Sequence, residues 1–274
     1  MADTEGNIAT DETTDVATPL NVTASKMRAR RQYRTQGWSD ADLVAELAGS
    51  DPMVRIASRA GAYWRRQFQL SLISTLKGIF ADNVANDSGD MVNDITGETG
   101  ADAMISAEAI LDTAQTMGDA SDALSLIIMH SVVYNNLAKQ NLIDFVPGSD
   151  GKSRFATYLG YRVVKDDGVQ KDTSGADIHY WSYLLGQGVV GFGESPPNVP
   201  VETFRYPDQG NGAGVEALWT RRQYLLHPYG FDWTDSSVAS DFPTNAELAT
   251  TANWNRVFAE RKQIAISALK SKNG

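Results

Sequence analysis

Apolar residues recur every three or four positions over a long stretch in the first third of the chain. The row comprises Ile56, Ala60, Trp64, Phe68, Leu72, Leu76 and Phe80. This spacing predicts one helix of about thirty residues, roughly 45 Å long. Asp51 is expected to cap it, with Pro52 in the first helical position. A compact domain does not need so long a helix, so the pattern predicts an elongated shape.

Shorter elements surround this helix. Ser39 is expected to cap a helix over residues 40–47, and Ser106 one that runs to a stop at Gly118. The apolar run 124–129 is typical of a buried central strand. Ser131 is expected to cap a helix that follows to about residue 142. Strand, tight turn and helix in succession indicate an α/β arrangement.

The pattern changes after Asp144, where glycines, prolines and short alternating runs predominate. Strands are predicted over residues 157–164, 178–185, 199–206, 215–226, 231–234, 254–258 and 263–269. The glycine-rich stretch 186–193 indicates a bulged strand. Thr244 is expected to cap a short helix over residues 245–250. The predicted fold class is α+β with long arms.

The net charge of the chain limits the classes of partner that it is expected to bind. A net charge of −10 makes general DNA binding a poor hypothesis, because such binding depends on Lys and Arg at phosphates. The absence of cysteine excludes disulfides and thiolate chemistry. No apolar run is long enough for a membrane span, and the first residues do not resemble a signal peptide.

The sharpest change in composition lies near the start of the chain. Residues 1–20 are acidic and poor in large apolar side chains, so we expect a mobile arm or one that a partner orders. A basic run follows, made of Lys26, Arg28, Arg30, Arg31 and Arg34. It is interpreted as a solvated face, as a segment that docks on an acidic neighbour, or as a nucleic-acid patch. Arg55, Arg59, Arg65 and Arg66 are interpreted as the soluble face of the long helix.

Side chains with catalytic potential are few. None of the three histidines has a metal-ligand partner three or four residues away. Asp166, Asp167 and Gly168 are typical of a turn. Ser131 with His227 leaves an α/β hydrolase-like enzyme open as an alternative, although the motif around a hydrolase nucleophile is absent. We therefore predict no enzyme, catalytic residue, cofactor or metal.

Several stretches resemble the major capsid proteins of tailed bacteriophages with the Hong Kong 97-type fold. They occur in the same order along most of the chain, at residues 37–53, 105–112, 129–134, 139–145, 158–168, 227–230 and 243–254. This resemblance implies a Hong Kong 97-like capsid fold of the α+β class. It implies an N-terminal arm (1–20), an extended loop (21–50), a peripheral domain with a spine helix (51–119), an axial α/β domain (120–235) and a C-terminal return to the peripheral domain (236–274).

The resemblance also implies a structural function. Copies of the chain are expected to assemble into hexamers and pentamers, and these into an icosahedral head shell that encloses double-stranded DNA without sequence-specific binding. Scaffolding, portal and decoration proteins are further expected partners. The expected localisation is the virion, after assembly in the host cytoplasm. An encapsulin-type compartment shell is an alternative with the same fold.

The expected contacts between subunits involve the basic run. They comprise Arg28, Arg30, Arg31, Arg34 and Trp38. We expect the arginines to dock on the acidic surface of an adjacent subunit, so that reversing the charge of Arg30 and Arg31 lowers particle yield.

Overall fold

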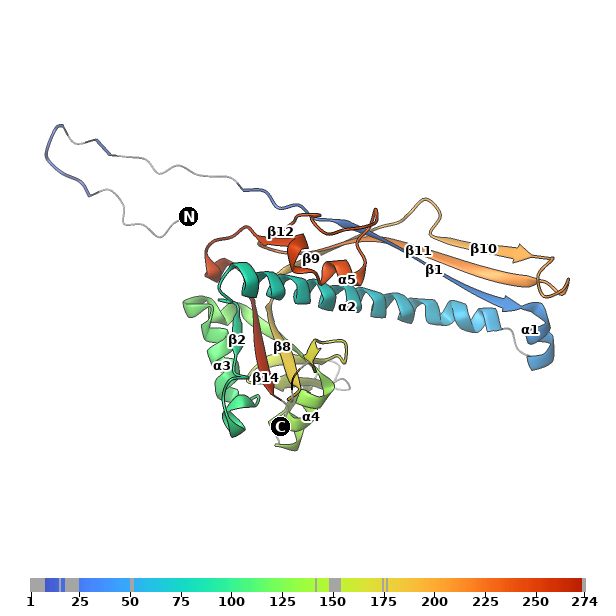
Figure 1. Ribbon diagram of the computed structural model, residues 1–274, viewed down its shortest axis with the longest axis horizontal. Coiled ribbons are helices and arrows are strands. Elements are labelled where there is room, and N and C mark those ends of the chain that lie inside the picture. The colour runs from blue at the N-terminus through green and yellow to red at the C-terminus, as the bar shows by residue number, and fades with distance from the viewer. Residues whose placement is uncertain are drawn as a thin grey trace.

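The computed structural model describes most of the chain. The described residues are 8–14, 16–17, 25–49, 52–140, 142–147, 154–173, 175 and 177–272. They form an elongated body with a long helix along its length and a sheet on either side of that helix (Figure 1).

The long helix α2 spans Pro52–Asn86, thirty-five residues, and is about 52 Å long. The predicted helix is confirmed and continues six residues beyond Phe80. Its second half lies in the core, where Leu76 and Ile79 are fully buried. Its first half is largely exposed and extends away from the core (Figure 1). The expected cap, Asp51, lies outside the described residues.

The other helices are short. They are α1 (Asp42–Ala48), α3 (Ala107–Gln115), α4 (Ser131–Lys139) and α5 (Asn245–Leu248), with 3₁₀ turns at Gly100–Ala103, Gly118–Ala123, Thr251–Asn253 and Arg261–Gln263. The caps at Ser106 and Thr244 are confirmed, since each side chain accepts a backbone N–H three residues on. Two other caps were wrong. Ser39 lies within a strand, and the cap of α4 is His130, whose Nδ1 accepts the N–H of Val132 at 3.2 Å.

A four-stranded antiparallel sheet lies along the exposed half of α2. It consists of β1 (Arg31–Ala41), β9 (Val190–Ser195), β10 (Val201–Tyr206) and β11 (Val215–Pro228). The fourteen-residue β11 is central: β1 pairs along one edge, and β9 and β10 share the other. No strand was predicted at β1. β1 has few apolar residues, and its pairing with β11 joins segments far apart in the chain.

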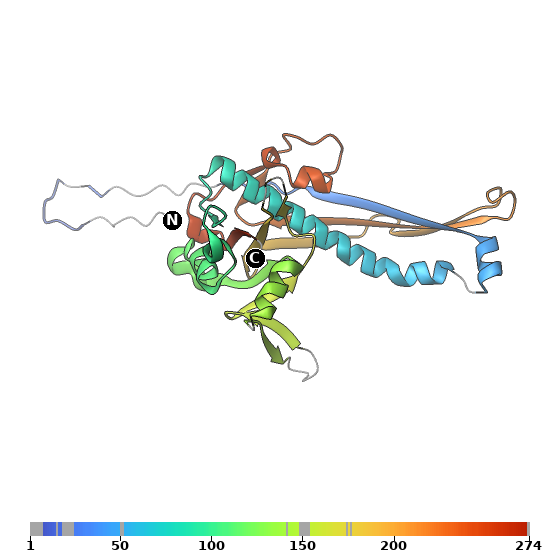
Figure 2. The same cartoon turned by 60° about the horizontal axis from the view of Figure 1, so that its bottom comes forward.

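An eight-stranded mixed sheet forms the wider end of the body. Its strands are β2 (Val92–Asp94), β3 (Leu124–Met129), β4 (Asp144–Pro147), β5 (Arg154–Tyr158), β6 (Tyr161–Lys165), β7 (Lys171–Asp172), β8 (His179–Gly186) and β14 (Ile266–Lys272). The order is β2-β14-β8-β3-β6-β5-β4, with β7 beside β8. β4 and β5 project from the body (Figure 2). A separate pair, β12 (Phe231–Trp233) and β13 (Trp254–Arg256), lies close to α2.

Both faces of the eight-stranded sheet are covered, as the alternation of buried side chains along β8 shows. Trp181, Tyr183 and Leu185 face α2, and the ring of Tyr183 stacks on that of Phe80 at 5.2 Å. The intervening Leu184 packs on the opposite face, against a second core that includes α3 and α4. The sheet is therefore the centre of a layered unit, as the buried run 124–129 predicted.

Several sequence-based boundaries were wrong. Residues 157–164 form the hairpin β5–β6, with Leu159 and Gly160 at positive φ in its turn. Residues 186–193 are not one bulged strand, because β8 ends at Gly186 and β9 belongs to the other sheet. Strand 254–258 ends at Arg256, and strand 263–269 begins only at Ile266.

The two sheets do not divide the chain at the expected domain boundaries. Residues 190–228, expected in the axial domain, lie in the sheet with β1. The C-terminal β14, expected to return to the peripheral domain, lies between β2 and β8 in the eight-stranded sheet. Patterns along a single strand do not specify its partner, and these pairings span many residues. The domain names themselves stay predictions.

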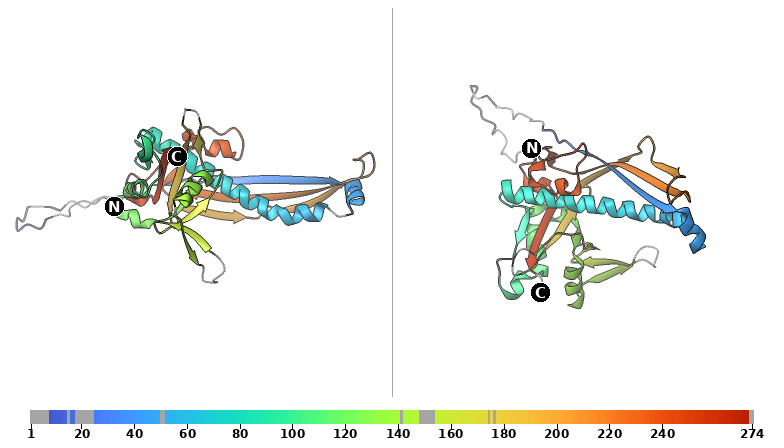
Figure 3. Two further views of the ribbon diagram at one scale, coloured as in Figure 1. Left: turned by 90° about the horizontal axis from the view of Figure 1, so that it is seen from below. Right: turned by 45° about the vertical axis from the view of Figure 1, so that its right-hand side comes forward.

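The views in Figure 3 show the four-stranded sheet and the first half of α2 extending together to one side of the layered unit. Among the described residues, no helix is both long and apolar enough to cross a membrane.

Candidate subunit-contact surfaces

The four-stranded sheet, α1 and residues 52–70 of α2 form a projecting arm, here called the wing. Its inner side is held together by a row of aromatic rings. Trp38 of β1 lies edge-on to Tyr63 at 5.3 Å, and Phe68 lies edge-on to Tyr224 of β11 at 4.7 Å. Between them, Trp64 donates a hydrogen bond to Thr220 at 3.0 Å. The wing therefore has its own small core, and Trp38 packs within the chain.

Beyond Phe242, which stacks on Tyr33 near the base of the wing, the outer face of the wing sheet has no covering layer among the described residues. Phe204 and Trp219 are both exposed on it. Trp219 lies over Gly37, where any Cβ would come within 2.7 Å of the indole. Glycine at that position lets the indole lie flat on the neighbouring strand. Exposed aromatic side chains grouped in this way mark a surface for association.

The end of the wing carries a second apolar surface, the wing tip, consisting of Leu43, Val44 and Leu47 of α1 and Val54 at the start of α2. Leu47 is 81% exposed and Leu43 is 50% exposed. The sequence pattern predicted a helix over residues 40–47, and Leu43, Val44 and Leu47 are its apolar positions. The helix exists, but its apolar side contacts little of its own chain. Because this surface lies at the far end of a projecting arm, another molecule can reach it (Figure 1).

Two arginines of the predicted contact set fix the base of the wing. Arg28 forms a salt bridge with Asp232 at 2.7 Å, and its backbone N–H donates to the same carboxylate at 2.6 Å. The hydrogen bonds from Arg28 hold the pKa of Asp232 below its ordinary value. Arg30 pairs with Asp235 at 3.1 Å. These carboxylates belong to the same chain, so docking of Arg28 and Arg30 on another subunit stays a prediction.

Arg31 and Arg34 also contact their own chain. The guanidinium of Arg31 lies 5.4 Å from the ring centre of Phe242, and Arg34 donates to Asn245 at 3.0 Å. The structure thus brings the predicted set together along one strand and its approach. A role between subunits for Arg31 and Arg34 also stays a prediction.

The structure does not bring Ser131 and His227, the residues of the enzyme alternative, into one site. Ser131 is the first residue of α4, whereas His227 lies in β11 of the other sheet. His227 uses its Nε2 with the carbonyl oxygen of Phe231 at 2.8 Å, and its ring lies by Trp254. In the described part of the chain, no three His, Asp or Glu side chains are grouped so that they could hold a metal ion.

The burial of His227 affects the stability of the folded chain. Its Nδ1 is buried without a hydrogen-bond partner within the described chain. Desolvation lowers the pKa of His227 below 6.5, against the opposing effects of Phe231 and Asp232. The unfolded state therefore binds more protons near pH 6, and stability is lost as the pH falls from about 6.5 through the lower folded-state pKa. Of the nearby charges, Asp232 titrates below this window and Arg28 above it.

We expect the His227→Gln chain to lose part of this dependence, because glutamine keeps a donor for Phe231 and does not titrate. Urea unfolding at pH 7 and pH 5 measures the free energy of unfolding at both values. The free energy of unfolding should fall less between these values in the variant than in the parent chain. An identical fall in both would contradict the assignment to His227.

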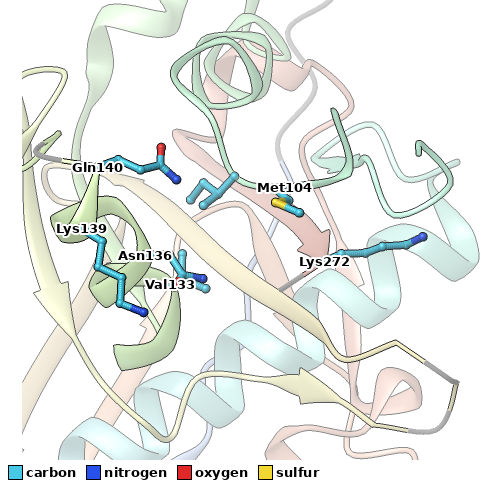
Figure 4. A pocket seen from close by; sticks show the side chains of 7 residues that line it. Met104, Val133, Asn136, Lys139, Gln140 and Lys272 are labelled. Atoms are coloured by element: carbon cyan, nitrogen blue, oxygen red, sulfur yellow. The ribbon is translucent and has the colours of Figure 1, made fainter. Parts of the chain in front are cut away.

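A recess of about 310 Å³ lies between α4 and the C-terminal strand (Figure 4). It is lined by Met104, Ile105, Val133, Asn136, Lys139, Gln140 and Lys272. None of these side chains is a carboxylate, a hydroxyl or a histidine, and Figure 4 shows the two lysines on opposite sides. The lining offers neither an acid–base pair nor a nucleophile in reach of a base.

Comparison with known proteins gives one extensive sequence match and many structural ones. The chain is 38% identical over 263 residues to the major capsid protein of Bacillus phage SPP1, covering 95% of this chain and 78% of that protein. No protein-family model matches.

Solved structures share the fold at low sequence identity. The capsid of Ralstonia phage GP4 matches with a TM-score of 0.58 at 8% identity, covering 89% of this chain and 74% of that one. A chain of Mycobacterium phage Adephagia matches with a TM-score of 0.55 at 12% identity, covering 97% and 80%. The SrpI encapsulin of Synechococcus elongatus matches with a TM-score of 0.50 at 9% identity, covering 87% and 73%. These likenesses concern the fold alone.

Proposed function

Because the chain belongs to the major capsid proteins of tailed bacteriophages with the Hong Kong 97-type fold, we propose that its wing joins copies of it into the hexamers and pentamers of a head shell around double-stranded DNA. The protein is a structural subunit and not an enzyme. The observation that carries the proposal is the wing itself, a projecting arm with an apolar tip and two exposed aromatic rings, Phe204 and Trp219, on its outer face.

The physical argument concerns buried area. The aromatic row around Trp64 holds the wing together. The surface of the wing therefore lies far from the layered unit, where an adjacent subunit can contact it. When one surface of a subunit meets a different surface of the next, the contact is head-to-tail and closes into a ring if the rotation permits. Stable contacts of this class bury about 2,000 Å² or more. A projecting arm supplies such area without a larger core.

We assign the domains on sheet membership. The four-stranded sheet and α2 correspond to the extended loop and the peripheral domain with its spine helix. The eight-stranded unit, including β14, corresponds to the axial domain. The pairing of β1 with β11 along eleven residues supports the first assignment, because it places the extended loop and the central strand of the wing in one sheet.

The remaining expectations are part of this proposal. Scaffolding, portal and decoration proteins are proposed partners, and the host cytoplasm is the proposed place of assembly. Contacts between subunits at Arg28, Arg30, Arg31, Arg34 and Trp38 are proposed as a second role beside the contacts within the chain. The encapsulin alternative has the weaker support, since that likeness is limited to the fold. Nuclease-protected double-stranded DNA in purified particles would separate the two, because a compartment shell would protect none.

Replacing Leu47 with aspartate tests the wing tip. We expect assembled particles to fall roughly tenfold or more at fixed protein concentration, since each subunit loses a buried leucine and gains a buried charge, and about 1.4 kcal/mol suffices for tenfold. The melting temperature of the unassembled chain should not change, because Leu47 is 81% exposed. Sedimentation velocity and negative-stain microscopy give the assembled fraction.

Leu111→Asp is the matched control. Leu111 is also an exposed leucine on a helix, α3, in the layered unit away from the wing. Particles should form from this variant at nearly the parental yield. Equal yields from the two variants, whether high or low, would contradict a specific role of the wing tip.

A further inference from the structure

The charges on α2 are segregated. Arg55, Arg59, Arg65 and Arg66 lie in its first half, and no Asp or Glu occurs in the helix before Asp82. The chain as a whole is acidic, with a net charge of −10. Arg55 occupies the first turn, where the positive end of the helix disfavours a cation. Arg55 and Arg59 are four residues apart, a spacing at which like charges repel.

These arginines share a side of the helix. At about 100° per residue, Arg55, Arg59 and Arg66 lie within about 40° of one another, and Arg65 lies about 80° from Arg55, at the edge of this side. Trp64, which packs against the wing sheet, is on the opposite side. The stripe formed by Arg55, Arg59, Arg65 and Arg66, here called the arginine stripe, therefore faces away from the wing sheet. No described element runs along this side of residues 52–62 (Figures 1 and 3).

One member of the stripe is neutralised within the chain. Arg66 forms a salt bridge with Asp166 at 2.8 Å. Arg55, Arg59 and Arg65 are exposed, and the described part of the chain offers them no ion pair. Arg55 is unfavourable in the first turn, and Arg55 and Arg59 repel each other, so an anionic partner on this side would stabilise the helix.

The same sequence contains an anionic segment of suitable chemistry. Residues 1–20 contain Asp3, Glu5, Asp11, Glu12 and Asp15 and no Lys or Arg. The nine described residues before Ser25 are all exposed. This segment joins the body at the start of β1, the end remote from the wing tip (Figure 1). Twenty-four extended residues span up to about 80 Å, more than the length of α2.

We propose that the arginine stripe of α2 binds the acidic N-terminal segment of an adjacent copy of this chain. The proposal rests on the proposed function, which places copies side by side. The segment is favoured over nucleic acid because the chain is strongly acidic overall, so that a DNA strand on the stripe would be repelled by the rest of the surface. A duplex carries its phosphates past the stripe and over this acidic surface, whereas a short segment with five carboxylates can place its charge at the stripe alone.

Cysteine pairs test the contact directly, because the chain contains no cysteine of its own. One population of full-length chains carries Thr13→Cys and an affinity tag, and a second carries Ala62→Cys, which lies on the exposed stripe between Arg59 and Arg66. The two are assembled together and oxidised. We expect a disulfide-linked dimer of one tagged and one untagged chain. Val84→Cys, exposed in the second half of the same helix, replaces Ala62→Cys in the control and should give little dimer.

Charge reversal supplies the second measurement. Arg55→Glu with Arg59→Glu should lower the dimer yield about tenfold, and adding Asp11→Arg with Glu12→Arg should restore most of it. The control, Lys77→Glu with Lys171→Glu, makes the same change of net charge at exposed lysines away from the stripe.

Two results would overturn the proposal. One is a dimer yield no higher than with Val84→Cys, and the other is a charge reversal that lowers DNA retention in filled particles while leaving the crosslink unchanged. Microscopy of the parental chain separates these outcomes from failure of the proposed function. If particles form and no crosslink is found, only the arm contact is wrong.

Discussion

Replacing Gly78 with alanine is expected to lower the free energy of unfolding by roughly 3 kcal/mol, although alanine is the better helix former. A Cβ at this position would lie 2.2 Å from the backbone oxygen of Leu248 and 2.5 Å from the indole nitrogen of Trp254. These two atoms are themselves joined by a hydrogen bond of 2.7 Å. The added methyl group must therefore push α5 and the turn behind it away from α2.

The same helix provides the control. Gly61 lies in the exposed half of α2, and nothing lies within 4 Å of a Cβ built there. Gly61→Ala should stabilise the chain by up to about 1 kcal/mol through helix propensity alone. Urea unfolding followed by tryptophan fluorescence measures both variants. Similar free energies for the two alanine variants would show that the close approach at Gly78 carries no cost.

Gly78 also shows what a sequence pattern leaves out. The row from Ile56 to Phe80 predicted α2 because helical periodicity is a local property of consecutive residues. The same row gave no reason for a glycine within it. The reason is the segment 244–254, which crosses the helix at backbone distance and is some 170 residues away in the chain. Local order could thus be predicted from the sequence, and the partner of each element could not.

The same limit applies to the candidate contact surfaces, whose partners could not be predicted from the sequence. Leu43, Val44 and Leu47 form a helical apolar stripe, and periodicity predicts that such a stripe is buried without saying in which molecule. The basic run before β1 was predicted as an association site, and the structure shows that Arg28 and Arg30 first bind acids of their own chain. Those acids lie more than 200 residues further on. A sequence reveals the charge of a segment, and only the fold reveals which opposite charge is nearest.

Replacing Arg66 with methionine is expected to destabilise the chain by roughly 2–4 kcal/mol, because it leaves a buried carboxylate without its cation. The side chain of Asp166 is 0% exposed, and both of its oxygens accept hydrogen bonds from Arg66 at 2.8 Å. Its one other described donor is the N–H of Gly168 at 2.7 Å. Since Arg66 is 44% exposed, water can partly replace it, which keeps the expected loss below that of a fully enclosed pair.

Arg65→Met is the matched control, since Arg65 is the adjacent exposed arginine and forms no ion pair among the described residues. Its unfolding free energy should stay within about 0.5 kcal/mol of the parent value. Asp166→Asn in the Arg66→Met background should recover part of the loss, because the uncompensated charge is then absent. Equal stability of the Arg65 and Arg66 variants in urea would contradict this account. The expected difference has a consequence for assembly, because this pair joins α2 to the turn after β6. It is therefore one direct link between the wing and the layered unit, and a shell of repeated subunits requires the same arrangement of the two in every copy.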